Sequence, residues 1–214
     1  MRTRAAWDAA LAFRAGLGWQ SQLQVHVPYV HAAAATESTT ALGDVSLSFL
    51  KQLARDEGRR PGLFATLGWV SGTGKDGFDG HLPTGGFDIA QAGLTAVKRH
   101  DPLAYFTGVS YSVPRSREIS GVDVRPGNAT GLRGGAVLAA TPETSVNVGL
   151  NLSFAAASRV NGERVADSDS LLGTLKLGFG TVLSRSGMLN VSGEFRVSGN
   201  VPNLRLVLGL PIRF

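Results

Sequence analysis

The stretch NLRLVLGLPIRF, residues 203–214, decides the fold, because large apolar side chains occupy every second position. The even positions carry Leu204, Leu206, Leu208, Leu210, Ile212 and Phe214. The odd positions carry polar, small or charged residues, with Arg205 and Arg213 among them. A period of two predicts a β-strand with one apolar face and one mixed polar face. The medium that the apolar face meets then decides which kind of sheet this strand joins.

The same alternation recurs along the chain. It is clean at residues 5–15, 21–30, 145–154, 171–183 and 188–198, and less regular at 43–53, 61–70, 87–98, 103–113 and 131–140. Only residues 48–58 would also suit a short helix. With the closing stretch, these segments predict about eleven strands of about 9–13 residues. Globular strands usually run about 5–6 residues, whereas a tilted membrane-spanning strand needs about 9–11.

The connectors between these strands alternate in length. The short ones lie at residues 16–19, 55–60, 99–102, 141–144 and 184–187, and the long ones at 31–43, 71–86, 114–130 and 155–170. The last connector on the long side, residues 198–202, is short. Outer-membrane barrels have short periplasmic turns and long outer loops. We therefore predict an all-β fold, an antiparallel up-and-down transmembrane β-barrel that forms a single domain over residues 1–214.

Strand parity extends this prediction. If the short turns are periplasmic, Phe214 ends at the periplasmic rim and the first strand begins on the outer side. Bacterial single-chain barrels have an even number of strands. We therefore expect about 12 strands in the intact protein, with about 11 present here and with one further strand and a signal peptide upstream of Met1.

The composition excludes several classes of protein. Charged residues make up 17% of the chain, below the roughly 25% typical of soluble domains. The chain has no Cys, which rules out disulfides and thiolate metal sites. The net charge of +5 comes from dispersed residues, so we expect no nucleic-acid partner. No apolar run approaches the roughly 20 residues of a membrane helix.

Several motifs resemble one family. They are VPYV (27–30), LGDVSL (42–47), GTGK (72–75) and KRHDPLAYFTGVSY (98–111), followed by the last strand that ends in Phe. Over residues 16–214 the chain resembles the outer-membrane barrels named as transporters of the MetA pathway of phenol degradation. The resemblance implies an exported barrel that passes small, often aromatic, compounds. It also implies that Leu210, Ile212 and Phe214 form the signal read by the barrel assembly machinery.

The face opposite the apolar residues is rich in charge. It is expected to carry Arg14, Gln22, Gln24, His26, Arg133, Asn147, Asn151, Lys176, Asn190, Glu194, Arg196, Arg205 and Arg213. Unpaired charges in a dry core cost several kcal/mol each, so we expect this face to line a wet lumen. The lumen is either a conduit that favours anions, or a space braced by salt bridges of Glu194 with Arg205 or Lys176.

Two further sets of apolar and aromatic residues have expected places. Phe78, Leu82 and Phe87 lie in a long connector, where they either contact a solute at the mouth or belong to a solvated surface loop. Aromatic residues near strand ends are expected to form girdles at the two membrane interfaces. This second set is Trp7, Trp19, Tyr29, Trp69, Tyr105, Tyr111 and Phe214.

No catalytic or metal motif is complete. SGTGKDG (71–77) lacks the spacing of a phosphate loop, and GVSYS (108–112) lacks the second Gly of a nucleophile elbow. The four His residues have no metal-ligand spacing. We therefore expect no enzyme, no cofactor and no metal.

These patterns predict a multi-pass protein of the outer membrane of a Gram-negative bacterium. The first hypothesis is a channel for passive uptake of small aromatic or anionic solutes. The second is a non-conducting structural or ligand-binding barrel with a salt-bridged lumen. A soluble sandwich or lipocalin-like binder conflicts with strands that place charges opposite their apolar face. The expected partners are outer-membrane lipids, the assembly machinery and a small solute.

Overall fold

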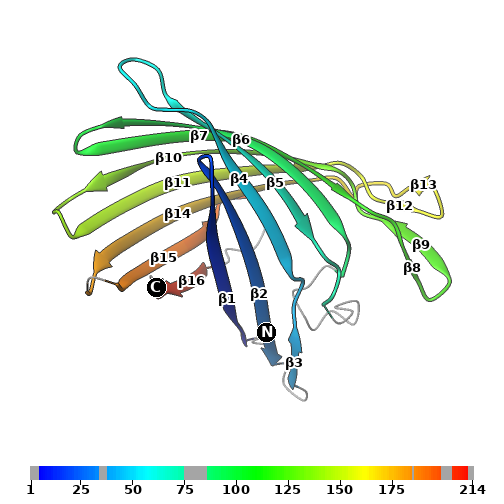
Figure 1. The fold of residues 1–214 in the computed structure, drawn as a ribbon. Coiled ribbons are helices and arrows are strands. Elements are labelled where there is room, and N and C mark those ends of the chain that lie inside the picture. The colour runs from blue at the N-terminus through cyan, green and yellow to red at the C-terminus, as the bar shows by residue number, and fades with distance from the viewer. Residues whose placement is uncertain (1–4, 34–37, 75–85, 185, 199–203, 212–214) are drawn as a thin grey trace.

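One large antiparallel sheet dominates the computed structural model, which describes residues 5–33, 38–74, 86–184, 186–198 and 204–211. The strand order is β1-β2-β4-β5-β6-β7-β10-β11-β14-β15-β16, and β3 also pairs with β2. The sheet is long and strongly curved, with consecutive strands as neighbours (Figure 1). Such a meander is the arrangement expected of an up-and-down barrel.

Most strands are long. Their bounds are β1 Ala5–Gly18, β2 Ser21–Ala33, β3 Ser38–Leu42, β4 Ser46–Ala54, β5 Gly62–Val70, β6 Ile89–His100, β7 Leu103–Pro114, β10 Ala129–Ala139, β11 Thr144–Ala155, β14 Ser170–Val182, β15 Met188–Arg196 and β16 Leu204–Gly209. All eleven predicted strand positions are therefore present. The possible helix at residues 48–58 is wrong, because β4 occupies most of it. The described residues form no helix that is long and apolar enough to cross a membrane.

Two of the predicted long loops contain hairpins. The first is β8 Arg117–Ile119 with β9 Val122–Arg125, and the second is β12 Arg159–Val160 with β13 Glu163–Arg164. The two join through β9 and β12 into a four-stranded sheet, here called the ledge, which extends beyond the main sheet (Figure 1). Both turns have two residues with positive φ, as in type I′ hairpins. The strand β3 likewise lies within the long connector predicted at residues 31–43.

One face of the main sheet is apolar and exposed. Val148 lies opposite Leu177, and Val191 lies opposite Leu208. Leu208 is 75% exposed and many other large apolar side chains are also exposed. Among the described residues, only Ala41 and Phe87 are buried hydrophobics. The sheet thus has no apolar core of its own, and its apolar face requires an apolar medium.

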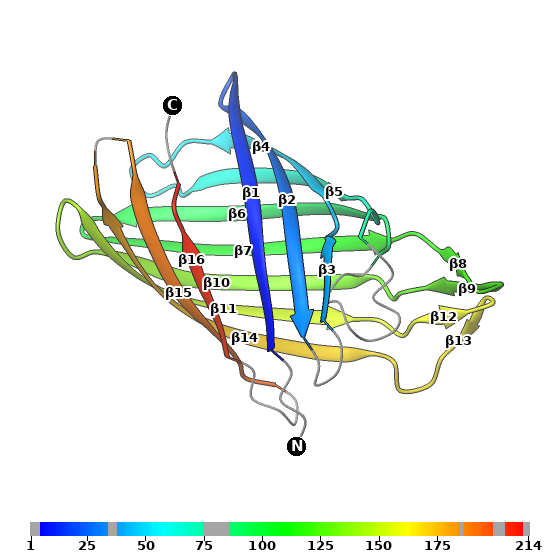
Figure 2. The same cartoon turned by 90° about the horizontal axis from the view of Figure 1, so that it is seen from below.

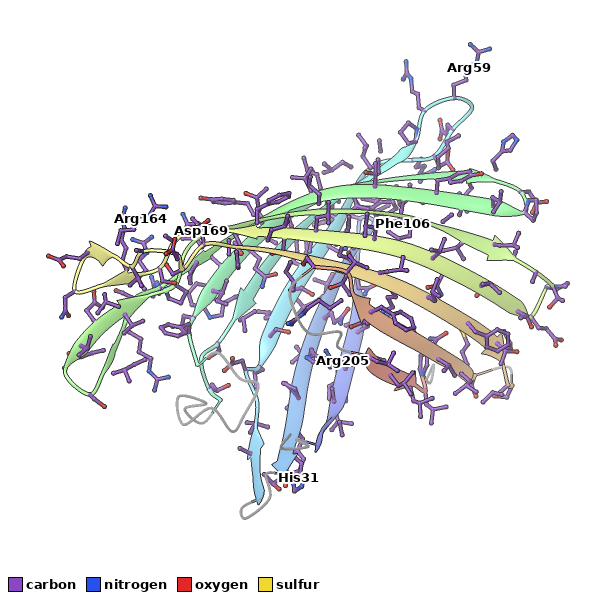
Figure 3. The ribbon with its side chains drawn as sticks, turned by 180° about the vertical axis from the view of Figure 1, so that it is seen from behind. His31, Arg59, Phe106, Arg164, Asp169 and Arg205 are labelled. Atoms are coloured by element: carbon purple, nitrogen blue, oxygen red, sulfur yellow. The ribbon has the colours of Figure 1, made fainter. Side chains whose placement is uncertain are left out.

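The other face is polar and concave. Lys176, Glu194 and Arg205 all lie on this face, because Glu194 is the direct cross-strand partner of Lys176 on one side and of Arg205 on the other. Arg205 lies on the concave side of the curved sheet (Figure 3). The strands therefore separate an outer apolar surface from an inner polar surface, as in transmembrane barrels.

The sheet is open in the part of the chain that is described. β1 and β16 form its two edges and are not paired with each other (Figure 2). Every pairing along the order is antiparallel, so after eleven positions β1 and β16 run in the same direction. The expected antiparallel closure is therefore absent from the described residues.

The connection between β4 and β5 is held by a carboxylate. Asp56 Oδ1 accepts from Lys98 Nζ at 2.5 Å, and its Oδ2 accepts from the backbone N–H of Arg99 at 2.9 Å. The hydrogen bond from Lys98, followed by that from the Arg99 backbone, holds the pKa of Asp56 below its ordinary value. This carboxylate ties the short-turn end of β4 to that of β6.

The facing of the strands can be tested on β7. Val109 lies on the apolar face between Leu94 and Leu132, while Ser110 lies on the polar face between Gly93 and Gly131. Val109→Arg should lower the free energy of unfolding from lipid vesicles by about 2–4 kcal/mol, since the strand centre meets hydrocarbon. Ser110→Arg, the matched control, should cost much less. Equal losses in urea titrations would contradict the assigned faces.

The Asp56 contact predicts a pH dependence. A carboxyl whose pKa is lowered on folding stabilises the fold above its unfolded pKa of about 3.9, and this stabilisation is lost as the pH falls through the folded value. Asp56→Asn should therefore unfold at a lower denaturant concentration than the wild type at pH 7. The difference should close in more acidic buffer. Glu57→Gln, next to it and exposed, should match the wild type at every pH.

Candidate functional site: the concave polar face

The predicted lumen-facing residues share one face of the sheet. The register places them together through pairs such as Arg14 with Gln24, Arg133 with Asn151, and Asn151 with Thr174. The set on this face is Arg14, Gln22, Gln24, His26, Arg133, Asn147, Asn151, Lys176, Asn190, Glu194, Arg196 and Arg205. Arg213 lies outside the described residues. A lumen-lining role for this set remains a prediction.

An ion pair links β14 and β15 near the β16 edge. Lys176 Nζ lies 3.2 Å from Glu194 Oε1, and Arg205 is the cross-strand partner of Glu194 on its other side. The side chains of Lys176 and Glu194 are 39% and 27% exposed, so water weakens the attraction. Exposed pairs contribute about 0–1 kcal/mol, so this one orients the side chains more than it stabilises the sheet.

Arg133 reaches across a whole strand. It starts on β10, and its Nη2 donates to Thr95 Oγ1 on β6, which lies beyond β7. The path crosses Gly108, where an added Cβ would lie 3.0 Å from Arg133 Nε and 2.8 Å from the Leu94 carbonyl oxygen. The glycine in GVSYS therefore makes room for an arginine. Sequence reasoning missed this bridge, because no local pattern shows which strand a long side chain will reach.

Phe106 is an aromatic residue on the polar face. Its cross-strand partner on β10 is Gly135, whose own partner on β11 is Gly149. An added Cβ would lie 2.6 Å from Phe106 Cζ at Gly135, and 3.5 Å from it at Gly149. The ring thus lies over two glycines. Sequence reasoning missed Phe106 because its segment, residues 103–113, has large side chains on both faces.

The asparagines of this face also lie over glycines. An added Cβ at Gly178 would lie 2.5 Å from Asn147 Oδ1, and one at Gly180 would lie 2.8 Å from Asn190 Oδ1. At the opposite edge, Arg14 Nε donates to Gln24 Oε1 at 3.0 Å. Polar side chains therefore lie along the sheet surface and bond to neighbouring strands.

The face has a positive balance of charge. By register its cations are Arg14, Arg99, Arg133, Lys176, Arg196 and Arg205, and its anions are Asp8 and Glu194. Arg133 is exposed, and its Nη2 donates to a neutral hydroxyl rather than to a carboxylate. Such a surface attracts small anions and repels small cations.

The expected contacts at the mouth and at the chain end are only partly described. Phe87 is 9% exposed and offers little surface to a solute, while Phe78 and Leu82 lie outside the described residues. Asp44 accepts hydrogen bonds from the backbone N–H groups of Gly74 and Gly86 at 3.0 and 3.1 Å, which holds together two points of the connector between β5 and β6, beside Phe87. Leu210 is exposed, and Ile212 and Phe214 are not described.

Aromatic residues mark the ends of the apolar face. Trp19 is 90% exposed at the β1–β2 turn, on the short-turn side. At the other end, the guanidinium of Arg115 lies over the ring of Trp69, 5.3 Å from the ring centroid. Tyr29, Tyr105 and Tyr111 are all exposed. The side chain of Trp7, like Phe214, is outside the description. This distribution is compatible with interfacial girdles, which stay a prediction.

One hollow lies on the apolar face, away from these charges. Its volume is about 560 Å³, and Val146, Val148, Leu177 and Phe179 are among its lining residues. These side chains belong to the outward face of β11 and β14. An aliphatic chain suits such a lining better than a polar solute does.

Solved structures share this architecture. A COG4313 outer membrane channel from Pseudomonas putida F1 matches with a TM-score of 0.77 and 15% identity, over 96% of this chain and 81% of the channel. The transport unit of the autotransporter AIDA-I from Escherichia coli matches with a TM-score of 0.53 and 16% identity, over 100% of this chain and 84% of that unit. No family model and no curated protein matches the chain. The chain thus shares the all-β antiparallel architecture of these outer-membrane proteins, and the resemblance to MetA-pathway transporters is not confirmed.

The packing around Phe106 predicts that alanine substitutions at two neighbouring glycines have different effects on the free energy of unfolding. Gly135→Ala should lower the free energy of unfolding by about 1–3 kcal/mol, because its Cβ would also lie 2.3 Å from the Val148 carbonyl oxygen. Gly134 points to the other face, where the nearest atom would be 3.7 Å away, so Gly134→Ala should be neutral or slightly stabilising. Denaturant midpoints measure both. Equal midpoints for the two variants would contradict the packing.

Proposed function

We propose that the chain forms an outer-membrane β-barrel channel for the passive passage of small anionic or aromatic solutes. One observation carries the proposal, namely a sheet without an apolar core whose outer face is apolar and whose inner face is polar and cationic. The fold shared with outer-membrane barrels supports the location. The resemblance to aromatic-compound transporters and the ring of Phe106 on the polar face favour aromatic anions such as carboxylates.

The intact channel is proposed to be a closed barrel of twelve strands. In hydrocarbon every backbone N–H and C=O must find a protein partner, so neither β1 nor β16 can remain an open edge. Because these two strands run in the same direction, antiparallel closure needs one further strand between them. A barrel of that size is wider than the eight-stranded barrels that side chains fill, and narrower than a porin.

A second candidate is a non-conducting barrel with a braced lumen. The contacts of Lys176 with Glu194 and of Arg133 with Thr95 favour it, because each crosses between strands. In a narrow barrel, such bridges could fill the cross-section. Both candidates have the same described structure. They differ in whether ions pass through the lumen.

Reversal potentials in planar bilayers separate them. The refolded closed barrel, with its further strand, should conduct in discrete steps and prefer chloride over potassium, because the concave face is cationic. Arg133→Gln with Arg196→Gln should move the reversal potential toward that of potassium. Arg59→Gln with Arg60→Gln removes the same charge at an exposed short turn and should leave selectivity unchanged. A folded protein that never conducts would favour the braced barrel.

A further inference from the structure

The ledge carries three arginines side by side. Arg125 on β9 is the cross-strand partner of Arg159 on β12, which is the partner of Arg164 on β13. All three are exposed, and they are called the arginine row here. Direct partners on one face of a sheet have Cβ atoms about 4.5–5.5 Å apart, so like charges there repel each other. A row of this kind is unfavourable unless an anion lies across it.

Acidic side chains neutralise little of this row. Arg164 Nη2 lies 3.9 Å from Asp169 Oδ1, and both side chains are well exposed (Figure 3). Among the described residues, Arg125 and Arg159 have no carboxylate within salt-bridge distance. Glu118 and Asp123 share this face, but they lie two positions farther along β8 and β9, toward the hairpin tips. The positive charge is thus at the base of the ledge and the negative charge at its tip.

The row faces away from the mouth of the sheet. Arg117 belongs to the opposite face of the ledge, since its cross-strand partner is Val124 rather than Arg125. Arg117 Nη1 donates to the Gly86 carbonyl oxygen at 2.7 Å, which turns that opposite face toward the segment beside Phe87. The arginine row therefore points outward, and Figure 3 shows Arg164 on the side away from the concave face.

The base of the ledge adjoins the outer rim of the apolar surface. Arg125 is followed after three residues by β10, and Arg164 precedes β14 by five residues. At the same rim, Arg115 stacks on Trp69, an arrangement typical of a membrane interface. The outward cations therefore continue from the rim onto the ledge, at the level where lipid headgroups begin.

We propose that the arginine row binds the phosphate groups of a phosphorylated glycolipid in the outer leaflet. Arginine forks match phosphate oxygens with paired hydrogen bonds, and adjacent forks can hold one phosphate jointly. The apolar face below the row would take the acyl chains of the same lipid. This inference rests on the outer-membrane location proposed above.

The test uses the full chain folded in neutral detergent, with two lipid probes. The probes are bisphosphorylated lipid A and the same lipid without its phosphates, and affinity is measured by thermophoresis. The wild type should bind the phosphorylated lipid about tenfold or more tightly than the other, and added salt should reduce the difference. Arg125→Gln with Arg159→Gln should remove most of that preference while leaving the affinity for the dephosphorylated lipid unchanged.

The matched control removes the same charge elsewhere. Arg59→Gln with Arg60→Gln acts at the short-turn end and should keep the preference for phosphate. Equal binding of the two lipids by the wild type, an equal loss in both double variants, or full competition by inorganic phosphate at the lipid's own concentration would overturn the proposal. A chain that fails to insert into vesicles yet keeps its phosphate preference would contradict the outer-membrane channel and leave the arginine row supported.

Discussion

The backbone hydrogen bond is the interaction on which the rest of this structure depends. Inside a bilayer no water can satisfy a free N–H or C=O, so a spanning chain must pair all of them within the protein. Ten antiparallel ladders do this from β1 across to β16. Because the ladders carry the stability, the side chains need no shared core. Most of the large apolar ones can therefore point to one side, which is what the exposed outer face shows.

The same ladders shape the polar face. Neighbouring strands lie about 4.8 Å apart, so a long side chain that lies flat must pass over the next strand. Glycine allows this, as at Gly108 beneath Arg133 and at Gly135 beneath Phe106. The high glycine content is in part the consequence of side chains bridging strands on a surface that has no opposing layer. The charges held in this way give the concave face its cationic character, and a surrounding lipid would strengthen their field.

Alternation in the sequence was enough to predict the strands, their facing and the shared polar side, because a strand places successive side chains on opposite faces. It was least informative at residues 48–58, where a bulge between Gln52 and Ala54 shifts the pattern. The side-chain contacts between strands and the pairing of the two hairpins could not be predicted, because strand register brings together residues that are distant in sequence. The reach of Arg133 to Thr95 and the pairing of β9 with β12 are of this kind. The Asn161–Gly162 turn was a visible local signal for the second hairpin.

The most direct measurement is spin-label accessibility along β11, which the absence of native cysteine makes possible. A nitroxide would be attached at each position from Ser145 to Phe154 in turn, in the chain folded into phospholipid vesicles. We expect collisions with oxygen, which concentrates in hydrocarbon, to peak at Val146, Val148, Leu150, Leu152 and Phe154. Collisions with a water-soluble nickel chelate should peak at the positions between them. If the even-numbered residues from Val146 to Phe154 were shielded from both reagents, they would lie in a buried protein core. That result would contradict a sheet whose apolar face meets lipid.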